Sequence, residues 1–476
     1  MSLSVAGHDA FSARTFSITE ALSAPFDASI VAASHASDLD LDGMVGAEAS
    51  LEVDTGEGPR TWTGVVVDAE LVASEEAGVS TYHVRIAPKL ALLEHRAASR
   101  VYQHLSIPEI VKKVLEDFGV RVRLEIDHAA YPKHDYRVQH GEKDLDFVHR
   151  LLEEAGIAYR VDPHPEHGTQ VTLTDRPHAA EPKTTVRYLE NPSPDATSSY
   201  VTRLSLSRKV GSGAHTVRDH DFKKHKDVAL SASAVAHGVE SALGHVGFHL
   251  GAIVRHGESK AEELAKVALE SARARLATAS FTATTIHLAP GTVFRLADHP
   301  RPDLALDKPL LMLELAIEGS VYGDFSAHGR AAPASVPHRP ERKTPRPHVS
   351  GVESAVVVGP KGESIHTDEH GRVRVQFAWD KEQGYDETSS CWVRVSQAWA
   401  GAGYGMIALP RVGQEVLVGF LGGDPDQPVV LGRVYNAENP TPYKLPEAKT
   451  KTGLRTATVP ATPGESAYNE IAFEDA

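Results

Sequence analysis

The chain has 476 residues, more than one hydrophobic core supports, which predicts about three domains. Its 49 basic and 64 acidic residues give a formal net charge of −15, which argues against tight binding of nucleic acid or of an anionic membrane by the whole surface. The 29 prolines and 37 glycines suit a turn-rich β protein.

The single cysteine and the N-terminal residues both permit folding in the cytoplasm. Cys391 has no partner for an internal disulfide, and we expect it to be a small buried apolar side chain beside Trp392. The first residues lack a basic segment followed by an apolar core, so no secretory signal peptide is expected. No segment approaches the roughly 18 consecutive apolar residues of a membrane-spanning helix.

Residues 15–100 predict β-strands, because apolar and polar residues alternate with period two between polar turns. The first clear helix is expected at residues 107–118, after a Ser-x-x-Glu capping box that starts at Ser106. A second helix is expected within residues 139–161, where apolar residues recur at helical spacing and Gly156 supplies the stop.

The second predicted helix carries acidic side chains that resemble paired catalytic carboxylates. We interpret them instead as one solvated helix face whose acids pair with Lys143 and Arg150, because residues three and four apart on a helix are neighbours. The acids concerned are Asp144, Asp146, Glu153 and Glu154.

The 26 histidines are dispersed and form no metal-ligand pattern. His164 and His167 lie in a proline-rich turn without further ligands at the spacing of a zinc site. His366 and His370 lie in an expected hairpin, so they do not share a helix face as an HExxH motif requires. The sequence therefore predicts no metal site.

Residues 185–330 predict further strands around a long helix at residues 257–280. A membrane-surface helix is the alternative, but the apolar face is mostly alanine and holds no aromatic anchor. Residues 331–350 contain five prolines and predict a semi-rigid extended spacer, with a ligand for a proline-recognising module as the alternative. This run is the clearest domain boundary in the sequence.

The most regular β pattern lies at residues 372–436. Alternation sends one set of side chains inward and the other outward, as in a half-buried strand. The inward set is Val373, Val375, Phe377 and Trp379, and the outward set is Arg372, Arg374 and Gln376. The pattern returns at residues 392–396 and 415–420, and Gly-rich turns separate the runs. About five strands with tight turns predict a small closed barrel of the OB class.

The run CWVRVSQAWAGAGYGMIALPRVGQEVLVGFLGGDPDQPVVLGRVYN resembles the barrel of VgrG proteins, the spike proteins of type VI secretion systems, which are similar to contractile phage tail proteins. The two-helix segment resembles the base domain of the same family and the phage tail hub. Gln139, Glu142 and Asp144 match its pattern, whereas His140 stands where an aromatic residue is usual. Residues 468–475 resemble the Asn-Glu-x-x-x-Glu-Asp onset of the family's β-helix.

This resemblance implies a mainly β protein with a few helices and four parts. Residues 1–330 would form a phage tail hub-like base domain of two β-barrel subdomains with helices, and residues 331–350 a Pro-rich linker. Residues 351–440 would form an OB-fold barrel, and residues 441–476 the neck and the onset of a triple-stranded β-helix needle. Because no run of short Val-Gly repeats follows, we expect the chain to be truncated at the start of that needle.

The resemblance also implies a structural spike without catalytic residues, cofactors or bound metal. It implies a homotrimer that docks on the Hcp tube protein, carries a PAAR-type tip protein and effectors or their adaptors, and contacts baseplate components. Such a protein meets the target membrane only through mechanical puncture and binds no nucleic acid. It would be made in the bacterial cytoplasm and leave the cell through the type VI apparatus.

The sequence leaves three alternative functions open. A hub-spike of a contractile phage tail or of an extracellular contractile injection particle shares the architecture. A cell-wall-degrading enzyme needs a catalytic domain, and too few residues separate Tyr443 from Asn469 to hold one. A nucleic-acid-binding barrel needs a basic face with stacking aromatic side chains. The available basic residues are interspersed with acids: Arg372, Arg374, Arg394 and Arg411.

Overall fold

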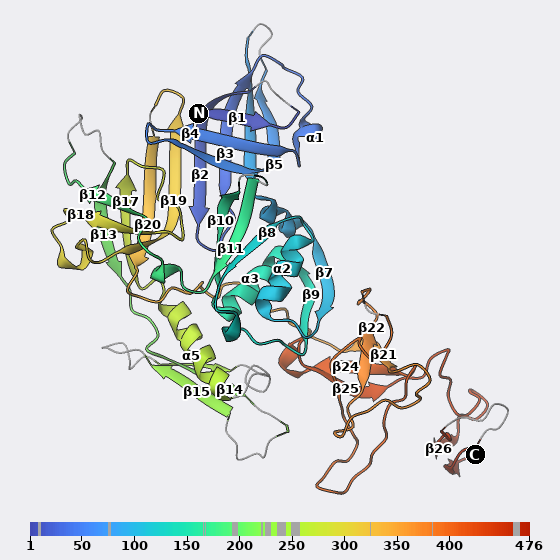
Figure 1. Ribbon diagram of the computed structural model, residues 1–476. Helices are drawn as coiled ribbons and strands as arrows, with labels where there is room; N and C mark the ends of the chain where they lie inside the picture. The colour runs from blue at the N-terminus through green and yellow to red at the C-terminus, as the bar shows by residue number, and fades with distance from the viewer. Residues whose placement is uncertain are drawn as a thin grey trace. The chain divides into compact units, whose positions relative to one another are not determined.

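The computed structural model describes residues 1–7, 11–74, 78–164, 166, 168–192, 199–219, 222–223, 230–235, 244–248, 258–323, 325–382, 384–459 and 467–476. The described chain is mainly β with few helices, which confirms the predicted fold class (Figure 1). It divides into two compact units. The base unit comprises Met1–Ala97, Ser106–Lys133 and Lys143–Pro345, and the barrel unit comprises Ala98–Leu105, His134–Glu142 and Arg346–Ala476.

The first part of the base unit is six antiparallel strands in the order β1-β4-β5-β6-β3-β2. Alternating apolar residues on one side of each strand build the core, as the period-two pattern predicts. The strands are β1 (Ser2–Val5), β2 (Ser12–Ala21), β3 (Asp27–Ser34), β4 (Glu48–Asp54), β5 (Pro59–Ala73) and β6 (Ser80–Ala87). The short helices α1 (Leu41–Met44) and η1 (Lys89–His95) accompany them.

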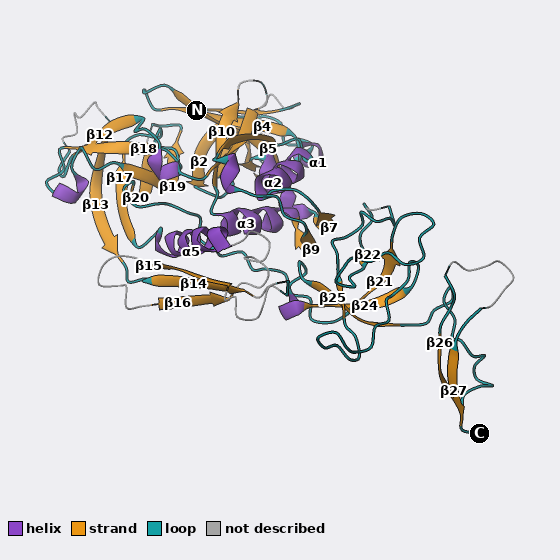
Figure 2. Ribbon diagram, turned by 60° about the horizontal axis from the view of Figure 1, so that its bottom comes forward, coloured by secondary structure: helices purple, strands orange, loops and turns teal. Residues whose placement is uncertain are grey.

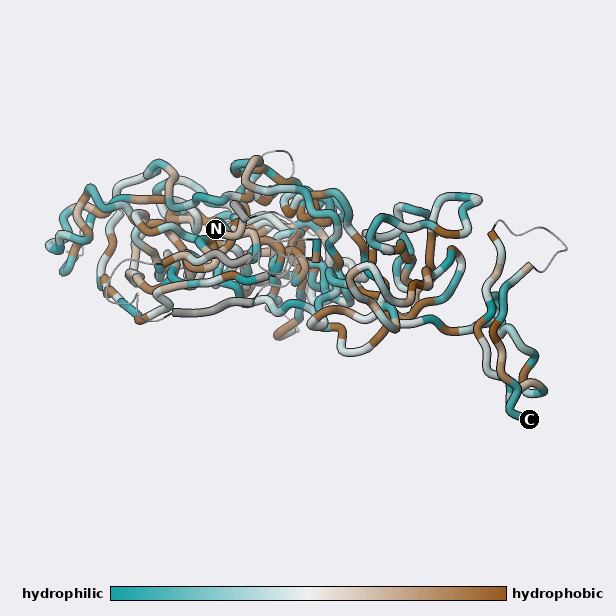
Figure 3. Tube along the Cα trace, turned by 90° about the horizontal axis from the view of Figure 1, so that it is seen from below, coloured by the Kyte–Doolittle hydropathy of each residue, from teal (hydrophilic) through white to brown (hydrophobic). Residues whose placement is uncertain are grey.

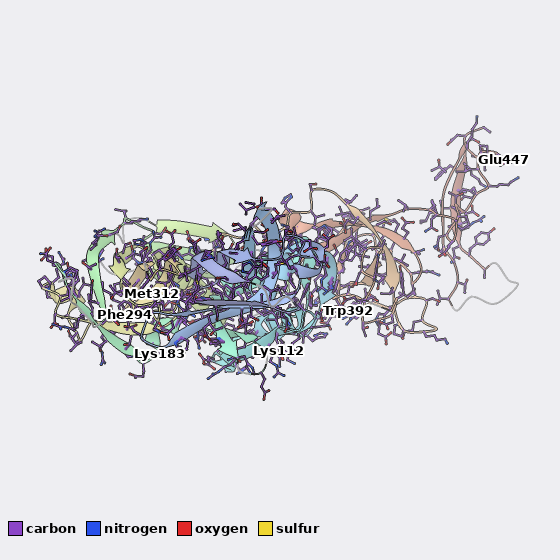
Figure 4. The ribbon with its side chains drawn as sticks, turned by 90° about the horizontal axis from the view of Figure 1, so that it is seen from above. Lys112, Lys183, Phe294, Met312, Trp392 and Glu447 are labelled. Carbon is purple, nitrogen blue, oxygen red and sulfur yellow. The ribbon has the colours of Figure 1, made fainter. Side chains whose placement is uncertain are left out.

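A second group of six strands closes into a barrel, because β19 pairs with both β18 and β20. The strands are β12 (Thr184–Tyr188), β13 (Tyr200–Arg208), β17 (Ala277–Ala283), β18 (Val293–Ala297), β19 (Leu310–Ser320) and β20 (Phe325–Pro333). Ile18 of β2 pairs with Ile317 of β19, so the two groups share one sheet and one hydrophobic core. Phe294 and Met312, labelled in Figure 4, are buried members of that core.

Two helices cover a three-stranded sheet of the base unit. They are α2 (Ile107–Glu116) and α3 (Asp144–Ala155), and the strands are β8 (Arg121–Glu125), β10 (Ala158–His164) and β11 (Gly168–Thr174) (Figure 2). The capping box is confirmed, since the Ser106 N–H donates to Glu109 Oε2 at 2.7 Å. Gly156 ends the second helix in the left-handed region, with φ of 69°, as its position predicts.

The long helix α5 (Glu258–Arg273) is shorter than predicted. The sequence pattern extended this helix to residue 280, whereas residues from Ala277 onward form β17. Strand pairing explains why the helix ends early. β17 lies between β13 and β20 in the sheet and buries Phe281 in the core. The helix packs against β14 (Ala214–Asp219) and β15 (Leu230–Val235), and β16 (Gly244–Phe248) completes their small sheet.

The barrel unit contains the predicted OB-class barrel. Its sheet has the order β22-β21-β24-β25-β23, and a bridge between Val373 and Val393 links the two ends. The strands are β21 (Glu353–Val358), β22 (Arg374–Phe377), β23 (Arg394–Val395), β24 (Glu415–Phe420) and β25 (Pro428–Arg433). The prediction for residues 415–420 is confirmed, while the strand expected at residues 392–396 shrinks to two residues.

The inward set of the first barrel strand is confirmed, because Val373, Val375 and Phe377 lie in the barrel core. The expectation that the opposite face is solvated is wrong for Gln376, which is 1% exposed. Its side-chain amide donates to the backbone carbonyl of Asp380 at 2.8 Å. A neighbouring turn thus supplies the partner that the strand pattern alone does not reveal.

Two further two-stranded sheets complete the fold. β7 (Ala97–Tyr102) and β9 (Arg137–Lys143) form one of these sheets. The segments Ala98–Leu105 and His134–Glu142, which contain most of both strands, belong to the barrel unit, and we call them the finger. β26 (Lys451–Arg455) and β27 (Glu470–Glu474) form the neck hairpin. The described residues also contain 3-10 turns at His128–Ala130, Pro177–Ala179, Pro302–Leu304 and Leu421–Gly423.

Candidate assembly surfaces

The two faces of the neck hairpin differ in chemistry. On one face, the Tyr443 hydroxyl donates to Glu470 Oε1 at 2.5 Å and Arg455 donates to Glu470 Oε2 at 3.1 Å. The cationic groups of Lys451 and Arg455 lie 4.8 and 5.2 Å from the centroid of the Tyr443 ring. The hydrogen bond from Tyr443 lowers the pKa of Glu470 and raises the pKa of Tyr443. This face is covered within the chain.

The opposite face of the neck hairpin is apolar and exposed. The register pairs Thr452 with Phe473 and Leu454 with Ile471, so these four side chains point the same way. Leu454, Ile471 and Phe473 are 57%, 64% and 61% exposed. Figure 3 shows the brown, apolar stretches in this hairpin next to the C-terminus. A two-stranded sheet with such a face is marginal by itself and needs a cover.

A second exposed apolar group lies on the barrel loop at residues 396–410. A bridge between Ala400 and Gly405 shapes its tip, and the Trp399 and Tyr404 rings meet edge to face at 5.9 Å. Gly405 has φ of 138°, and a Cβ there would lie 2.5 Å from the Trp399 carbonyl oxygen, so glycine is required. The exposed side chains of this loop are Trp399, Tyr404, Met406 and Ile407.

The proline-rich segment is anchored on the base unit through residues 338–344. The carboxylate of Glu153, on α3, accepts from the backbone N–H groups of Lys343 and Thr344 at 3.0 and 2.8 Å and from the Thr344 hydroxyl at 2.9 Å. Arg339 donates to Glu270 at 2.9 Å and to the carbonyl oxygen of Asp175 at 2.7 Å. We call residues 338–344 the strap.

The acidic residues of α3 form the predicted solvated face only in part, since Asp146 is exposed as expected whereas Asp144 and Glu153 are not. Asp144 is fully buried and pairs with Arg96, and Glu153 is 5% exposed beneath the strap. Arg150 is 3% exposed and pairs with Glu154 at 3.5 Å, which confirms that one pair. For Asp144 and Glu153 the prediction of solvation is wrong because partners distant in sequence cover them, and buried charges persist where such partners exist.

The cysteine and the arginines that the sequence analysis singles out in the barrel make contacts within the chain. Cys391 is half-buried and packs beside Trp379 between the barrel core and the finger, while Trp392, labelled in Figure 4, lies under the Arg374 guanidinium. Arg372 pairs with Asp368, and Arg411 donates to a backbone carbonyl of the neck at 2.7 Å. These arginines are therefore engaged within the chain.

Among the residues that the structure describes, no three histidine, cysteine or acidic side chains cluster as a metal site. His164 is described, whereas His167 lies outside the described residues. None of the helices in the described ranges is long and apolar enough to cross a membrane.

Two features with a clear physical character, the apolar face of the neck and the Glu153 anchor, could not be found from the sequence pattern alone. The apolar face of the neck was visible as alternation in Thr452 to Leu454 and Ile471 to Phe473, but only their pairing register shows that they share a face. The Glu153 anchor has no signal in the neighbouring sequence, because its partners Lys343 and Thr344 follow 190 and 191 residues later.

Family comparisons define the class of protein. The family described as phage tail baseplate hub matches residues 19–321, and the one described as type VI secretion system/phage-baseplate injector OB domain matches residues 357–435. A solved structure of an Escherichia coli type VI secretion component, described as similar to the T4 tail proteins gp27 and gp5, has a TM-score of 0.68 at 22% identity and covers 91% of this chain and 100% of its own. The fold is thus a baseplate hub followed by an injector barrel.

Curated relatives narrow the class to one family. The Pseudomonas aeruginosa type VI secretion system spike protein VgrG1b is 34% identical over 96% of this chain and 62% of its own length. VgrG1a of the same organism is 32% identical over 92% of this chain and 69% of its own length. The chain belongs to the VgrG family of type VI secretion system spike proteins. It spans about three fifths to two thirds of the length of these relatives.

Proposed function

We propose that this chain is a trimeric, non-catalytic spike component of a type VI secretion system. The observation that carries the proposal is the apolar face of the neck hairpin, where Leu454, Ile471 and Phe473 are more than half exposed. Three copies arranged around one axis would cover this face mutually, because closed cyclic symmetry lets identical surfaces satisfy one another. The neck is therefore the part that the single chain leaves incomplete.

The distribution of apolar surface supports the same assembly. Among the described residues, most large apolar side chains that are exposed lie between Val352 and Phe473, in the barrel and the neck. Exposed apolar patches rimmed by polar residues mark interaction surfaces. Among the described residues of the base unit, most large apolar side chains are buried, many of them in one extended core. The barrel and neck would thus hold the trimer together.

The remaining roles follow from family membership and are proposals for this chain. The base docks on the Hcp tube and contacts baseplate components, while a PAAR-type tip protein and effectors or their adaptors lie on the distal needle. The assembly leaves the cytoplasm through the type VI apparatus and punctures the target envelope without breaking a covalent bond. One solved complex of a VgrG with PdpA, from Francisella, shows that a protein of this fold binds another protein.

One relative has a further activity in its name. A Vibrio cholerae relative is named actin cross-linking toxin VgrG1, and this chain covers 36% of its length. The two matched families in this chain are a hub and an OB domain, which supports a structural role for the part described. The phage-tail alternative shares both matches, and binding to an Hcp tube rather than to a phage tail tube separates the two.

The first experiment is the solution mass by light scattering over a dilution series, followed by co-sedimentation with Hcp tubes. A mass near three times 51.2 kDa that persists on dilution, with tube binding, is the expected result. A chain that remains a monomer even with a β-helix needle of a VgrG relative fused behind residue 476 would overturn the proposal.

A further inference from the structure

The barrel turn at residues 422–426 binds two arginines that come from other segments of the chain. Asp426 Oδ2 accepts a charge-assisted hydrogen bond from Arg137 Nη1 at 2.7 Å, and Asp426 Oδ1 accepts from the Val138 N–H at 2.8 Å. The side chains of Asp426 and Arg137 are 3% and 11% exposed. The finger is thus held by a carboxylate that is removed from water.

The second carboxylate of the turn holds the segment that follows the strap. Asp424 Oδ2 accepts from Arg346 Nη1 at 2.8 Å, and the Val349 N–H donates to the Gly423 carbonyl at 2.9 Å. Gly423 has φ of 74°, and a Cβ at this position would collide with the His348 ring. Only glycine therefore lets the segment at residues 346–349 pass so close to the turn.

The two carboxylates also constrain each other. Asp424 Oδ1 accepts from the Asp426 N–H at 3.0 Å, which fixes the turn between them. Burial and the neighbouring Asp426 raise the pKa of Asp424, and the charges of Arg346 and Arg137 oppose this shift. Each carboxylate therefore depends on its arginine, and the two pairs depend on one turn.

Apolar contacts reinforce the finger at the same unit. Val101, Tyr136 and Val138 are buried together, and Trp379 and Cys391 of the barrel pack against them. Arg100 pairs with Glu382 at 3.1 Å in a more exposed position. The finger lies within residues 19–321, which match the hub family, yet it packs as part of the barrel unit.

We propose that the turn at residues 422–426 is a clasp that fixes the finger and the segment after the strap to the barrel, so that axial force passes between hub and barrel along several chain segments. A spike joined by one proline-rich linker would transmit force through that linker alone. The chain passes from one unit to the other at both ends of each finger segment and again after Pro345. When the clasp holds the finger on the barrel, all of these connections can carry force. The mechanical role rests on the proposed spike function, whereas the clasp itself does not.

Hydrogen exchange followed by mass spectrometry on the full chain tests the clasp directly. Asp426→Asn keeps the shape but removes the charge that holds Arg137, so backbone amides at residues 98–105 and 134–142 should exchange at least about tenfold faster. Arg346→Gln opens the other arm and should speed exchange at residues 346–349 while the finger stays protected. This second variant lies at a partly exposed side chain, so where Asp426→Asn fails to fold, wild-type exchange at residues 346–349 in Arg346→Gln refutes the clasp.

Glu382→Gln is the matched control, because it also removes an acid that pairs with a finger arginine but lies at an exposed position. Its exchange rates should stay within about twofold of wild type. If Asp426→Asn and Glu382→Gln behave alike, or if the finger of Asp426→Asn exchanges at the wild-type rate, the clasp is refuted.

A delivery assay in a bacterium with an active type VI apparatus then tests the mechanical role. An Asp426→Asn protein that still forms trimers and binds Hcp tubes, but is exported about tenfold less than wild type, supports force transmission through the clasp. Wild-type export by this variant overturns that role. A wild-type chain that neither trimerises nor binds tubes overturns the spike function instead, and the exchange data still decide the clasp.

Discussion

Replacing Leu454 by alanine should weaken assembly of the proposed trimer, because this side chain is 57% exposed in the single chain and lies on the apolar face of the neck. Truncating a leucine that assembly buries costs about 2 kcal/mol per site. A trimer holds three copies, so the total is about 6 kcal/mol, which raises the dissociation constant roughly 10⁴-fold. The concentration of half-dissociation scales with the square root of that constant and should rise about 100-fold in light-scattering dilution series.

Leu306→Ala is the control for this change. Leu306 is 53% exposed, close to the value for Leu454, but it lies in the base unit. Its truncation removes the same atoms from a surface that the proposal leaves uncovered, so the dilution curve should match wild type. A trimeric wild-type chain whose Leu454→Ala variant dissociates at the same concentration would refute the assignment of the neck face to the interface.

Glu153→Gln should lower the free energy of unfolding of the base unit by about 2 kcal/mol in denaturant titrations, because the buried carboxylate accepts three hydrogen bonds from the strap. His338→Leu should flatten the pH dependence of stability. Burial lowers the pKa of His338 from 6.5 to about 3, so only the unfolded chain binds this proton between those values and wild-type stability falls by up to about 1.4 kcal/mol per pH unit on acidification. Gly453→Ala should displace the Tyr443 ring, which contacts Gly453, and speed amide exchange in the neck hairpin.

Each of these predictions has an outcome that contradicts it. Unchanged denaturant midpoints for Glu153→Gln would mean that the strap is not anchored by this carboxylate. Equal slopes of stability against pH for His338→Leu and wild type between pH 6.5 and pH 4 would exclude a buried neutral imidazole. Wild-type exchange in Gly453→Ala would show that the Tyr443 face does not order the neck.

Local features of the fold were predictable because their causes lie within a few residues. The capping box at Ser106, the glycine stop at Gly156 and the strand Glu415–Phe420 depend on neighbours in the sequence. The long resemblance around the OB barrel also led to the correct family. The overlong helix shows the limit of such patterns, since residues from Ala277 pair with β13 and β20, which lie far away in sequence.

Buried charges escaped prediction because charge patterning on a helix carries no information on what covers it. Asp144, Arg150 and Glu153 have the spacing of a solvated face, and each is buried. Their partners include Arg96 and the strap, which approach from other parts of the chain. A sequence pattern therefore identifies the charges, while only the tertiary structure shows which of them stabilise a connection.

The turn at residues 422–426 has both local features that a sequence predicts and distant partners that it does not. Its glycines and aspartates predict a turn, and the hydrogen bond from the Asp426 N–H to Asp424 is local. The same two carboxylates bind Arg137 and Arg346, which lie 289 and 78 residues away. Truncating Asp426 would remove the carboxylate that pairs with the largely buried Arg137 guanidinium, which costs more than losing a surface turn. Strong dependence of finger order on Asp426, with little dependence on Glu382, is therefore what distinguishes a clasp from a turn.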